Sequence, residues 1–339
     1  MPVTIKDVAK EAGVSISTVS KVINNSYTIS EETAKKVREV MEKLHYHPNL
    51  TARNFVKGST GNIIFLTNLE RNSAFANPHM FEIICGAQKS LEKKGYSLQI
   101  LNAPTNEAQI EAVERIIAQR NADGIILHGC ADNKELATFI LKASFPHMLI
   151  GCPNFDSQLC WVDVNNCLSG EIAAAHLVEE GYKDIAFIGA LETDFISVHR
   201  LQGVKKALKN LEIPINPAYI KQCADDISKA KKAMAELLQN KNPPDSVICE
   251  NNIIALGALE IIKQNGLKIP NDIAVITFDD YPFSQITEPK LTVVNIDVYE
   301  MGVQAGNMII NKIKKPNLQI QSYSTLPELI VRESTKKKA

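Results

Sequence analysis

Residues 15–24 combine small polar side chains with one lysine at helical spacing, which suits hydrogen bonding to the edges of DNA bases. The residues expected on the outward face are Ile16, Ser17, Ser20, Lys21 and Asn24. The inward face is apolar and comprises Val19, Val22 and Ile23. A lysine can donate to guanine, and an aliphatic side chain can contact the methyl group of thymine. An ordinary helical hairpin would show the same pattern, so this segment alone leaves both interpretations open.

Signals for catalysis are missing from the rest of the sequence. We find no GxSxG motif, no phosphate-binding GxxxxGK[ST] motif and no GxGxxG motif. His45 and His47 lie two residues apart but have no acidic or cysteine partner at a spacing typical of a metal site. We therefore expect a protein that is not an enzyme and needs neither a cofactor nor a metal.

The distribution of charge separates a basic amino-terminal segment from a mildly acidic remainder. Residues 1–60 contain nine basic and six acidic residues, whereas the other 279 residues contain 28 basic and 32 acidic ones. A small basic segment suits a polyanion. The seven cysteines are scattered without a CxxC pair, and no segment resembles a signal peptide or a membrane span. We expect a cytoplasmic protein with reduced thiols and no membrane partner.

The elements that would position residues 15–24 are three short helices within residues 1–47. Hydroxyl side chains precede each expected helix, at Thr4, Ser15 and Ser30, where they can accept a free backbone N–H. Gly13 lies between the first two helices, where a tight turn is needed. Two short helices joined by such a turn are typical of a helix-turn-helix.

From Gly61 onward, apolar strands alternate with amphipathic helices, which predicts an α/β fold with parallel sheets. The expected strands are Ile63–Thr67, Ser97–Leu101, Gly124–Leu127, Met148–Ile150, Ile185–Gly189, Val247–Cys249 and Ile273–Phe278. The expected helices include Phe81–Lys94, Ser169–Glu180 and Ile253–Gln264. A similar run of helix, glycine, tyrosine and strand occurs around Gly95 and Gly181, which fits two similar lobes with a ligand cleft between them.

Residues 2–60 resemble the amino-terminal part of the lac repressor family over most of their length. The matching segments are Asp7-Val8-Ala9, Ala12-Gly13-Val14-Ser15, Thr18-Val19-Ser20, Val22-Ile23-Asn24, Tyr46, Pro48, Asn49, Ala52 and Arg53. The resemblance implies sequence-specific binding to double-stranded DNA, with Ile16, Ser17 and Lys21 at the positions that read bases. The full set of predicted DNA contacts is Thr4, Ser15, Ile16, Ser17, Thr18, Ser20, Lys21, Asn24, Tyr46, Asn49, Ala52, Arg53 and Phe55.

Residues 48–60 resemble the hinge helix and linker of the same family. Asn49 can cap such a helix and Gly58 can end it, but a helix this short is marginal without a partner. The resemblance implies a helix that forms on DNA and inserts an apolar side chain into the minor groove. The family usually has leucine at that position, whereas this chain has Phe55, and Phe55 could instead be a core residue of the head.

Residues 61–339 resemble the periplasmic-binding-protein-like sensor of the family. The resemblance implies that Arg200, Asn251 and Asp279 bind the effector, although an ion pair or a helix cap would also explain each of them. A guanidinium, an amide and a carboxylate together suit the hydroxyl groups of a sugar. His79 and Met80 occupy positions where the family often has aromatic residues, and Cys152 lies where many sugar-binding members have an aspartate. These three residues complete the predicted effector site.

The sequence therefore predicts an all-α helix-turn-helix head at residues 1–47 and a two-lobed α/β sensor at 61–339. We place lobe one at about 61–162 and 292–326, and lobe two at about 163–291 and 327–335. The predicted function is a homodimeric transcription regulator, most often a repressor in this family, that binds a near-palindromic operator. A small molecule, expected to be a sugar or a sugar derivative, would control it. A solute-binding protein without a DNA role and an enzyme on a two-lobed fold are the alternatives.

Overall fold

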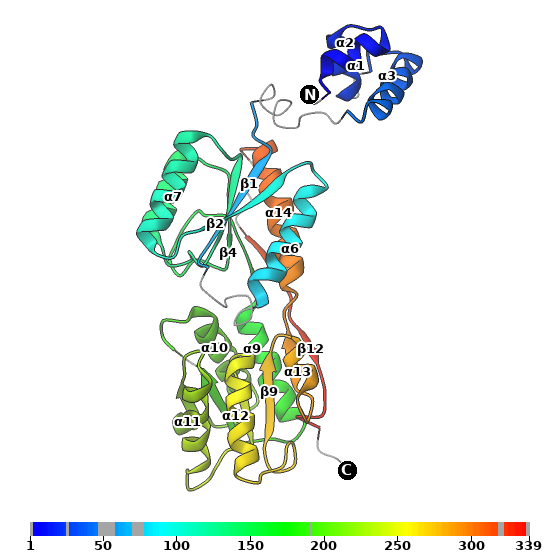
Figure 1. Ribbon diagram of the computed structural model, residues 1–339. Coiled ribbons are helices and arrows are strands. Elements are labelled where there is room, and N and C mark those ends of the chain that lie inside the picture. Colours follow the sequence, from blue (N-terminus) through cyan, green and yellow to red (C-terminus); the bar gives the residue numbers. More distant parts are fainter. Residues whose placement is uncertain are drawn as a thin grey trace. The chain divides into compact units, whose positions relative to one another are not determined.

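The structure, a computed structural model, describes residues 3–24, 27–46, 58–69, 78–189, 191–317 and 322–336. By its own contacts the chain divides into two compact units. One unit comprises residues 1–62 with 120–123, and the other comprises residues 63–119 with 124–339. Each unit is described separately (Figure 1).

The first unit contains the three helices predicted for the head, α1 (Ile5–Ala12), α2 (Ile16–Ile23) and α3 (Glu31–Lys43). Thr4, Ser15 and Ser30 precede the helices as predicted, and the Ser15 and Ser30 hydroxyls accept backbone N–H groups of the first turn. The buried core is small and aliphatic, and it comprises Val8, Ala9, Ala12, Val19, Val22 and Val37. Gly13 ends α1 with φ of 65°, a left-handed conformation that glycine adopts without strain.

The second unit contains two six-stranded sheets. The first has the order β11-β5-β4-β3-β1-β2, and we call it and its helices lobe one. Its strands are β1 (Asn62–Thr67), β2 (Ser97–Asn102), β3 (Gly124–His128), β4 (His147–Ile150), β5 (Trp161–Val164) and β11 (Ser322–Thr325). Its helices are α6 (Pro78–Glu92), α7 (Asn106–Gln119), α8 (Lys134–Ala143) and α14 (Val298–Lys314). Figure 1 shows α6 and α14 on one side of this sheet and α7 on the other.

The second sheet has the order β12-β10-β9-β8-β6-β7, and we call it and its helices lobe two. Its strands are β6 (Ile185–Gly189), β7 (Ile220–Gln222), β8 (Ser246–Cys249), β9 (Ala274–Phe278), β10 (Thr292–Asn295) and β12 (Glu328–Ile330). Its helical segments are α9 (Asn166–Glu179), α10 (Phe195–Asn210), η1 (Pro217–Tyr219), α11 (Ile227–Leu238), α12 (Asn252–Gln264) and α13 (Pro282–Ile286). Val247 and Val275 belong to the core cluster with α11 and α12, whereas Ile248 and Ile276 belong to the one with α9 and α10. Helices therefore cover both faces of the sheet.

The seven predicted strands and the three predicted helices of the body are confirmed to within three residues at each end. Five strands were not predicted from the sequence, namely β5, β7, β10, β11 and β12. Strands β7, β11 and β12 lie at sheet edges and are short and part-exposed, so they lack the apolar run that identified the others. The predicted parallel order is confirmed except that β12 pairs with β10 in the antiparallel direction.

The predicted division between the lobes is wrong at two points. Residues 292–295 were assigned to lobe one, but they form β10, which pairs with β9 in the sheet of lobe two. Residues 163 and 164 were assigned to lobe two, but they end β5, which pairs with β4 and β11 in lobe one. The chain therefore crosses between the lobes after β5, after β10 and between β11 and β12.

Glycines let pairs of helices approach closely in both lobes. A Cβ at Gly86 would lie 2.0 Å from the Tyr299 carbonyl oxygen, where α6 meets α14. A Cβ at Gly170 would lie 1.9 Å from the Arg200 carbonyl oxygen, where α9 meets α10. The second contact fixes the backbone that carries Arg200, one of the predicted effector residues. None of the helices in the described ranges has the length and apolar character needed to cross a bilayer.

Candidate functional site

The first candidate site is the exposed face of α2. Ile16 is 45% exposed although it is a large apolar residue, and Ser17, Lys21 and Asn24 are also exposed. Val19 and Val22 are buried on the opposite side, as predicted. An exposed isoleucine beside hydroxyls and a lysine fits apolar contact with a thymine methyl and donation to a purine.

Hydrogen bonds fix the start of this face. The Ser15 hydroxyl accepts the Thr18 N–H at 3.1 Å and lies 2.7 Å from the Ser17 hydroxyl and 2.8 Å from the Thr18 hydroxyl. At the other end, the Asn24 side-chain amide donates to the Ser20 carbonyl at 2.9 Å. The first turn of α2 is thus held in place before any ligand is present, with free backbone N–H groups that favour phosphate oxygens.

The remaining predicted DNA contacts differ in how the structure places them. Thr4 is exposed, and its hydroxyl donates to the Asp7 carboxylate at 2.7 Å. Tyr46 packs partly buried against the core of the head, and burial raises the pKa of its phenol. Asn49, Ala52, Arg53 and Phe55 lie outside the described residues.

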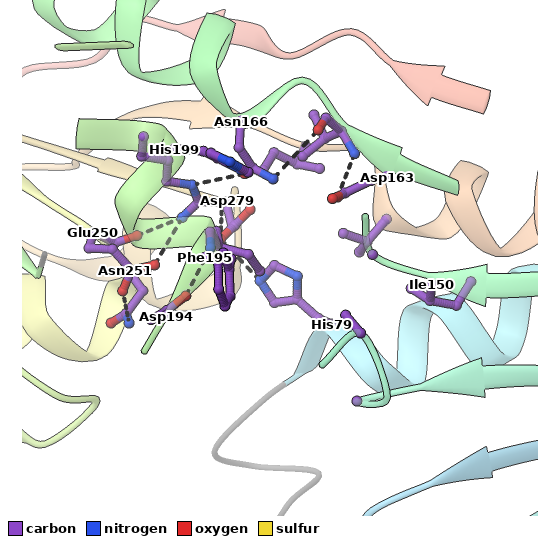
Figure 2. A pocket seen from close by; sticks show the side chains of 18 of the residues that line it. His79, Ile150, Asp163, Asn166, Asp194, Phe195, His199, Glu250, Asn251 and Asp279 are labelled. Carbon is purple, nitrogen blue, oxygen red and sulfur yellow. Dashed lines mark hydrogen bonds and ion pairs between the residues drawn. The ribbon is translucent and has the colours of Figure 1, made fainter. Parts of the chain in front are cut away.

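The second candidate site is a cavity of about 820 Å³ lined by both lobes. Its polar residues follow the carboxyl ends of strands, as ligand-binding residues usually do in open parallel sheets. Glu250 and Asn251 follow β8, Asp279 follows β9, and Asn166 follows β5. Figure 2 shows these side chains pointing into one space, with Ile150 and Asp163 of lobe one on its other side. A cavity of this size accommodates a small organic molecule.

Arg200 lies at the base of this cavity and is 3% exposed. Its guanidinium donates to the Glu250 carbonyl oxygen at 2.6 Å, to the Glu250 carboxylate at 3.5 Å and to the Asn166 amide oxygen at 3.3 Å. It also stacks on the Phe278 ring, with the guanidinium carbon 4.2 Å from the ring centroid. The guanidinium is therefore held in one orientation, with most of its donors already engaged.

Asp279 is 3% exposed and has a φ of 72°, a left-handed conformation that aspartate tolerates better than most residues. One carboxylate oxygen, Oδ2, lies 3.0 Å from His79 Nε2 and 4.0 Å from an Arg200 nitrogen. Burial alone would raise the pKa of Asp279, but attraction to His79, the His79 hydrogen bond and attraction to Arg200 together hold it below the ordinary value. Asp279 is therefore an ionised acceptor at neutral pH.

Glu250 behaves in the opposite way although it is only one strand away. Burial raises the pKa of its carboxyl to about 8. Attraction to Arg200 lowers this pKa, but repulsion from the nearby Asp194, Asp225 and Asp279 offsets part of that effect. Burial also raises the pKa of Asp225, opposed by its hydrogen bond from Asn251. The cleft thus keeps one carboxylate charged and its neighbour largely protonated at neutral pH.

Asn251 is the N-cap of α12, which is the alternative role that the sequence allowed for it. Its Oδ1 accepts the Ile254 N–H at 3.0 Å and caps α12, while its Nδ2 donates to Asp225 and to Glu250. Cys152 also lines the cavity. Its backbone N–H donates to Asp163 at 2.9 Å, and burial raises the pKa of its thiol, which therefore stays protonated.

The structure corrects the prediction for Met80. This side chain is 3% exposed in the core of lobe one, its sulfur accepts the Thr67 hydroxyl at 3.5 Å, and it does not line the cavity. The helix α6 turns His79 toward the cleft and the next residue toward the sheet. Met80 and His79 thus have different roles because adjacent helical positions point about 100° apart.

Comparison with known proteins identifies the family of the chain. Residues 4–49 match the model of the bacterial regulatory proteins of the lacI family, and residues 174–335 match a periplasmic binding protein-like domain. Over 98% of this chain, the HTH-type transcriptional repressor PurR of Histophilus somni (strain 129Pt) is 32% identical, and 99% of that relative is covered. The chain belongs to the lacI family of bacterial regulatory proteins.

Other proteins show how the lacI-family fold is used. The PurR repressor of Haemophilus influenzae (strain PittEE) is 29% identical over 98% of each chain. The transcriptional regulator CelR in complex with cellobiose has a TM-score of 0.74 and 26% identity, covering 98% of this chain and 99% of that one. A lac repressor dimer bound to operator and an anti-inducer has a TM-score of 0.82, covering 99% and 100%, and at 24% identity it shows the fold. The predicted family and fold are confirmed, and the enzyme alternative is not supported by these relatives.

Sequence reasoning missed several residues of the cleft. They are Asp163, Asn166, Asp194, Phe195, His199, Asp225, Glu250, Tyr281 and Phe283. All but His199 lie at or shortly after the carboxyl end of a strand, and His199 lies on α10, the helix that follows β6. That position is itself a signal, because the expected strands Ile185–Gly189 and Val247–Cys249 already marked where such residues begin.

Proposed function

We propose that this lacI-family chain is a transcriptional repressor whose α2 helix reads operator DNA and whose cleft binds the controlling small molecule. The observation that carries the proposal is the exposed face of Ile16, Ser17 and Lys21 on a capped helix of a three-helix head. The named relatives are repressors, and their similarity to this chain extends over nearly their full length, including the head. Binding to bacterial DNA places the action of the protein in the cytoplasm.

The operator of this proposal is nearly palindromic and is bound by a homodimer. Two-fold symmetry of the protein requires two related half-sites, each read by one head. The hinge at residues 48–60 and its apolar wedge at Phe55 belong to the same proposal, because they would couple the cleft to the DNA. A ligand controls binding only if it favours one arrangement of the two lobes over another.

The effector of this proposal is a sugar or a sugar derivative held mainly by lobe two. Asp279 offers an ionised acceptor, and the Arg200 and Asn251 side chains hold their neighbours in position. Phe195 and Phe283, 39% and 38% exposed, provide apolar surface at the cleft for the face of a ring. The mixture of fixed acceptors and aromatic surface suits a hydroxylated ring.

The test compares Lys21→Ala with Lys35→Ala, which removes an exposed lysine from α3 instead of α2. Operator sites are first selected from random DNA with the wild-type chain. We expect Lys21→Ala to weaken binding to a selected site by about 10-fold to 100-fold, the range for one good base contact, and to affect random DNA far less. Lys35→Ala should weaken both kinds of DNA by similar, small factors. Equal losses for both variants on the selected site would contradict the role of α2.

A further inference from the structure

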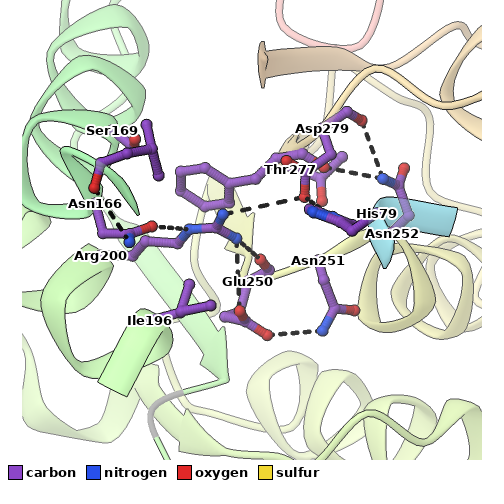
Figure 3. Close-up of polar contacts among 12 residues, drawn as sticks. His79, Asn166, Ser169, Ile196, Arg200, Glu250, Asn251, Asn252, Thr277 and Asp279 are labelled. Atoms are coloured by element: carbon purple, nitrogen blue, oxygen red, sulfur yellow. Dashed lines mark hydrogen bonds and ion pairs between the residues drawn. The ribbon is translucent and has the colours of Figure 1, made fainter. Parts of the chain in front are cut away.

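A hydrogen bond links the two lobes inside the cleft. His79 lies in the first turn of α6 in lobe one, and its Nε2 is 3.0 Å from Asp279 Oδ2 in lobe two. The edge of the His79 ring also meets the Tyr281 ring, with the centroids 5.0 Å apart and the planes at 69°. Since Asp279 is ionised and can only accept, His79 must donate its Nε2–H. A nitrogen donor from lobe one is therefore hydrogen-bonded to the Asp279 carboxylate, which we propose as a binding group for the effector (Figure 3).

The lobe-two face of the cleft carries a surplus of negative charge. The charge comes from the carboxylates of Glu192, Asp194, Asp225 and Asp279, because the fifth carboxyl group of this face, Glu250, is largely protonated at neutral pH. Arg200 is the one arginine among the described residues of this face, and its charge is directed at the carboxyl groups of Glu250 and Asp279, so it offsets only part of the surplus. Phosphate or carboxylate groups would be repelled here, whereas a positively charged group would be attracted.

Two buried acceptors at this face have no donor among the described residues. Asp279 Oδ1 and Asn252 Oδ1 accept no hydrogen bond, although both residues are more than nine-tenths buried and both line the cavity. The Asn252 amide is held by its nitrogen, which donates to the Phe278 and Asp279 carbonyl oxygens at 2.9 and 3.0 Å. A buried acceptor without a donor costs stability. Both oxygen atoms are shielded from solvent, so a ligand rich in N–H donors would gain from them only after it has displaced a neighbouring side chain.

We propose that His79 is a built-in substitute for a positively charged nitrogen of the effector, which binds Asp279 in place of the imidazole and so separates the two lobes. This inference rests on the proposed function, because it concerns the same cleft. It narrows the effector from any sugar derivative to one that carries an amine, an amidine or a similar nitrogen cation. A hydroxylated ring bearing such a group meets both the aromatic surface and the carboxylates.

The substitution has a direct consequence for binding. His79 is tethered, so it competes for Asp279 at an effective concentration on the order of millimolar. An effector must displace His79. Its apparent affinity is therefore the intrinsic affinity multiplied by the fraction of molecules in which the His79–Asp279 hydrogen bond is open. Removing the imidazole should therefore leave a site that small nitrogen cations can enter by themselves.

The experiment uses the full-length His79→Ala chain with imidazole as the probe. Alanine is a good helix former, and His79 is part-exposed at a helix start, so this substitution preserves the fold. His79→Ser, favoured near helix starts, serves as a second variant with the same space at Asp279. Thermal unfolding is measured at a pH of about 6, where imidazole is largely protonated. Pyrazole, a ring of the same size that stays neutral, is the matched control.

We expect imidazole at concentrations on the order of 10 mM to raise the melting temperature of His79→Ala by a few degrees. The wild-type chain should respond much less, pyrazole should have little effect, and adding Asp279→Asn to His79→Ala should abolish the response. An equal response to pyrazole and imidazole, or a response that survives Asp279→Asn, would overturn the inference. Sequence-selective DNA binding is measured on the same wild-type preparation. Its absence would contradict the proposed function, independently of how the melting temperature responds to imidazole.

Discussion

Lobe one and lobe two share one fold but present chemically different faces to the cleft. Their strand orders correspond position by position, β2-β1-β3-β4-β5-β11 against β7-β6-β8-β9-β10-β12. In each, a helix ends at a left-handed glycine, Gly95 or Gly181, and the next tyrosine N–H bonds to the carbonyl five residues earlier. Yet lobe one contributes two acidic residues to the cavity, Asp132 and Asp163, while lobe two contributes five.

Topology and ligand recognition are therefore separable in this molecule. The backbone supplies strand ends at the same places in both lobes, and the residues just after them decide what each lobe does. Lobe two carries the fixed acceptors. Lobe one supplies mostly apolar surface, including Ile83, Ile150 and Met301, together with the His79 link. Lobe two therefore selects the ligand, and lobe one contributes the histidine that the ligand must displace.

The largest expected effect is a loss of stability when a close contact between two helices is disrupted. It shows whether both lobes depend equally on such contacts. Gly170→Ala places a Cβ 1.9 Å from the Arg200 carbonyl oxygen, and Gly86→Ala places one 2.0 Å from the Tyr299 carbonyl oxygen. We expect each to lower the free energy of unfolding by about 3 kcal/mol or more in chemical denaturation. Only Gly170→Ala should also displace Arg200 and impair ligand binding. A loss below about 1 kcal/mol for either would show that the helices separate easily.

The next effect concerns the protonated carboxyl of lobe two. The pKa of Glu250 is about 8 in the folded chain because it is buried, whereas the unfolded carboxyl ionises near its ordinary value. Between these values the folded state holds one more proton, so its stability falls as pH rises. Relative to Glu250→Gln, the wild type should lose about 2–3 kcal/mol between roughly pH 5 and pH 7. Parallel stability curves for the two chains in urea would contradict this.

A third prediction compares carboxylates of the two lobes. Asp279→Asn keeps the shape and tolerates the left-handed backbone but removes the charge. We expect the affinity for an effector found by thermal-shift screening to fall by about 10-fold to 100-fold, since a hydrogen bond to a charged group contributes about 1.5–3 kcal/mol. Asp132→Asn in lobe one is the matched control, with little change in calorimetric titration. Comparable losses for both would mean that the lobes share recognition.

The smallest expected effect lies in lobe one. Cys152→Ser replaces a protonated thiol with a hydroxyl. The hydrogen bond to Asp163 comes from the backbone N–H of this residue, so the substitution leaves it in place. Stability and effector affinity should each change by less than about 0.5 kcal/mol, as for most substitutions away from fixed networks. A large loss of affinity in titration would assign lobe one a part in recognition that the present account does not give it.

The fold was largely predictable because its signals are local. Hydroxyl residues at Thr4, Ser15 and Ser30 and the apolar runs of the central strands need no knowledge of distant contacts. Edge strands such as β11 and β12 depend on pairing with strands far away in sequence, so their short polar segments carried no such signal. The strand β10 was assigned to the wrong lobe for a different reason, because a short buried strand does not show in its own sequence which of two sheets it joins.

The cleft was predictable only in part. Arg200, Asn251 and Asp279 were expected from the family resemblance, and the structure brings them to one cavity. Met80 was misplaced because its orientation depends on how α6 packs against β1, which the sequence does not reveal. The His79–Asp279 link joins residues 200 positions apart and could not be read from spacing.

The most direct test of the whole account is selection of binding sites from random double-stranded DNA with the full-length chain. The selection is repeated with Lys21→Ala and with the effector found by screening. We expect a near-palindromic consensus with two half-sites, which is lost or relaxed by Lys21→Ala and changes in occupancy when the effector is present. Recovery of no preferred sequence by the wild-type chain, with or without small molecules, would contradict it.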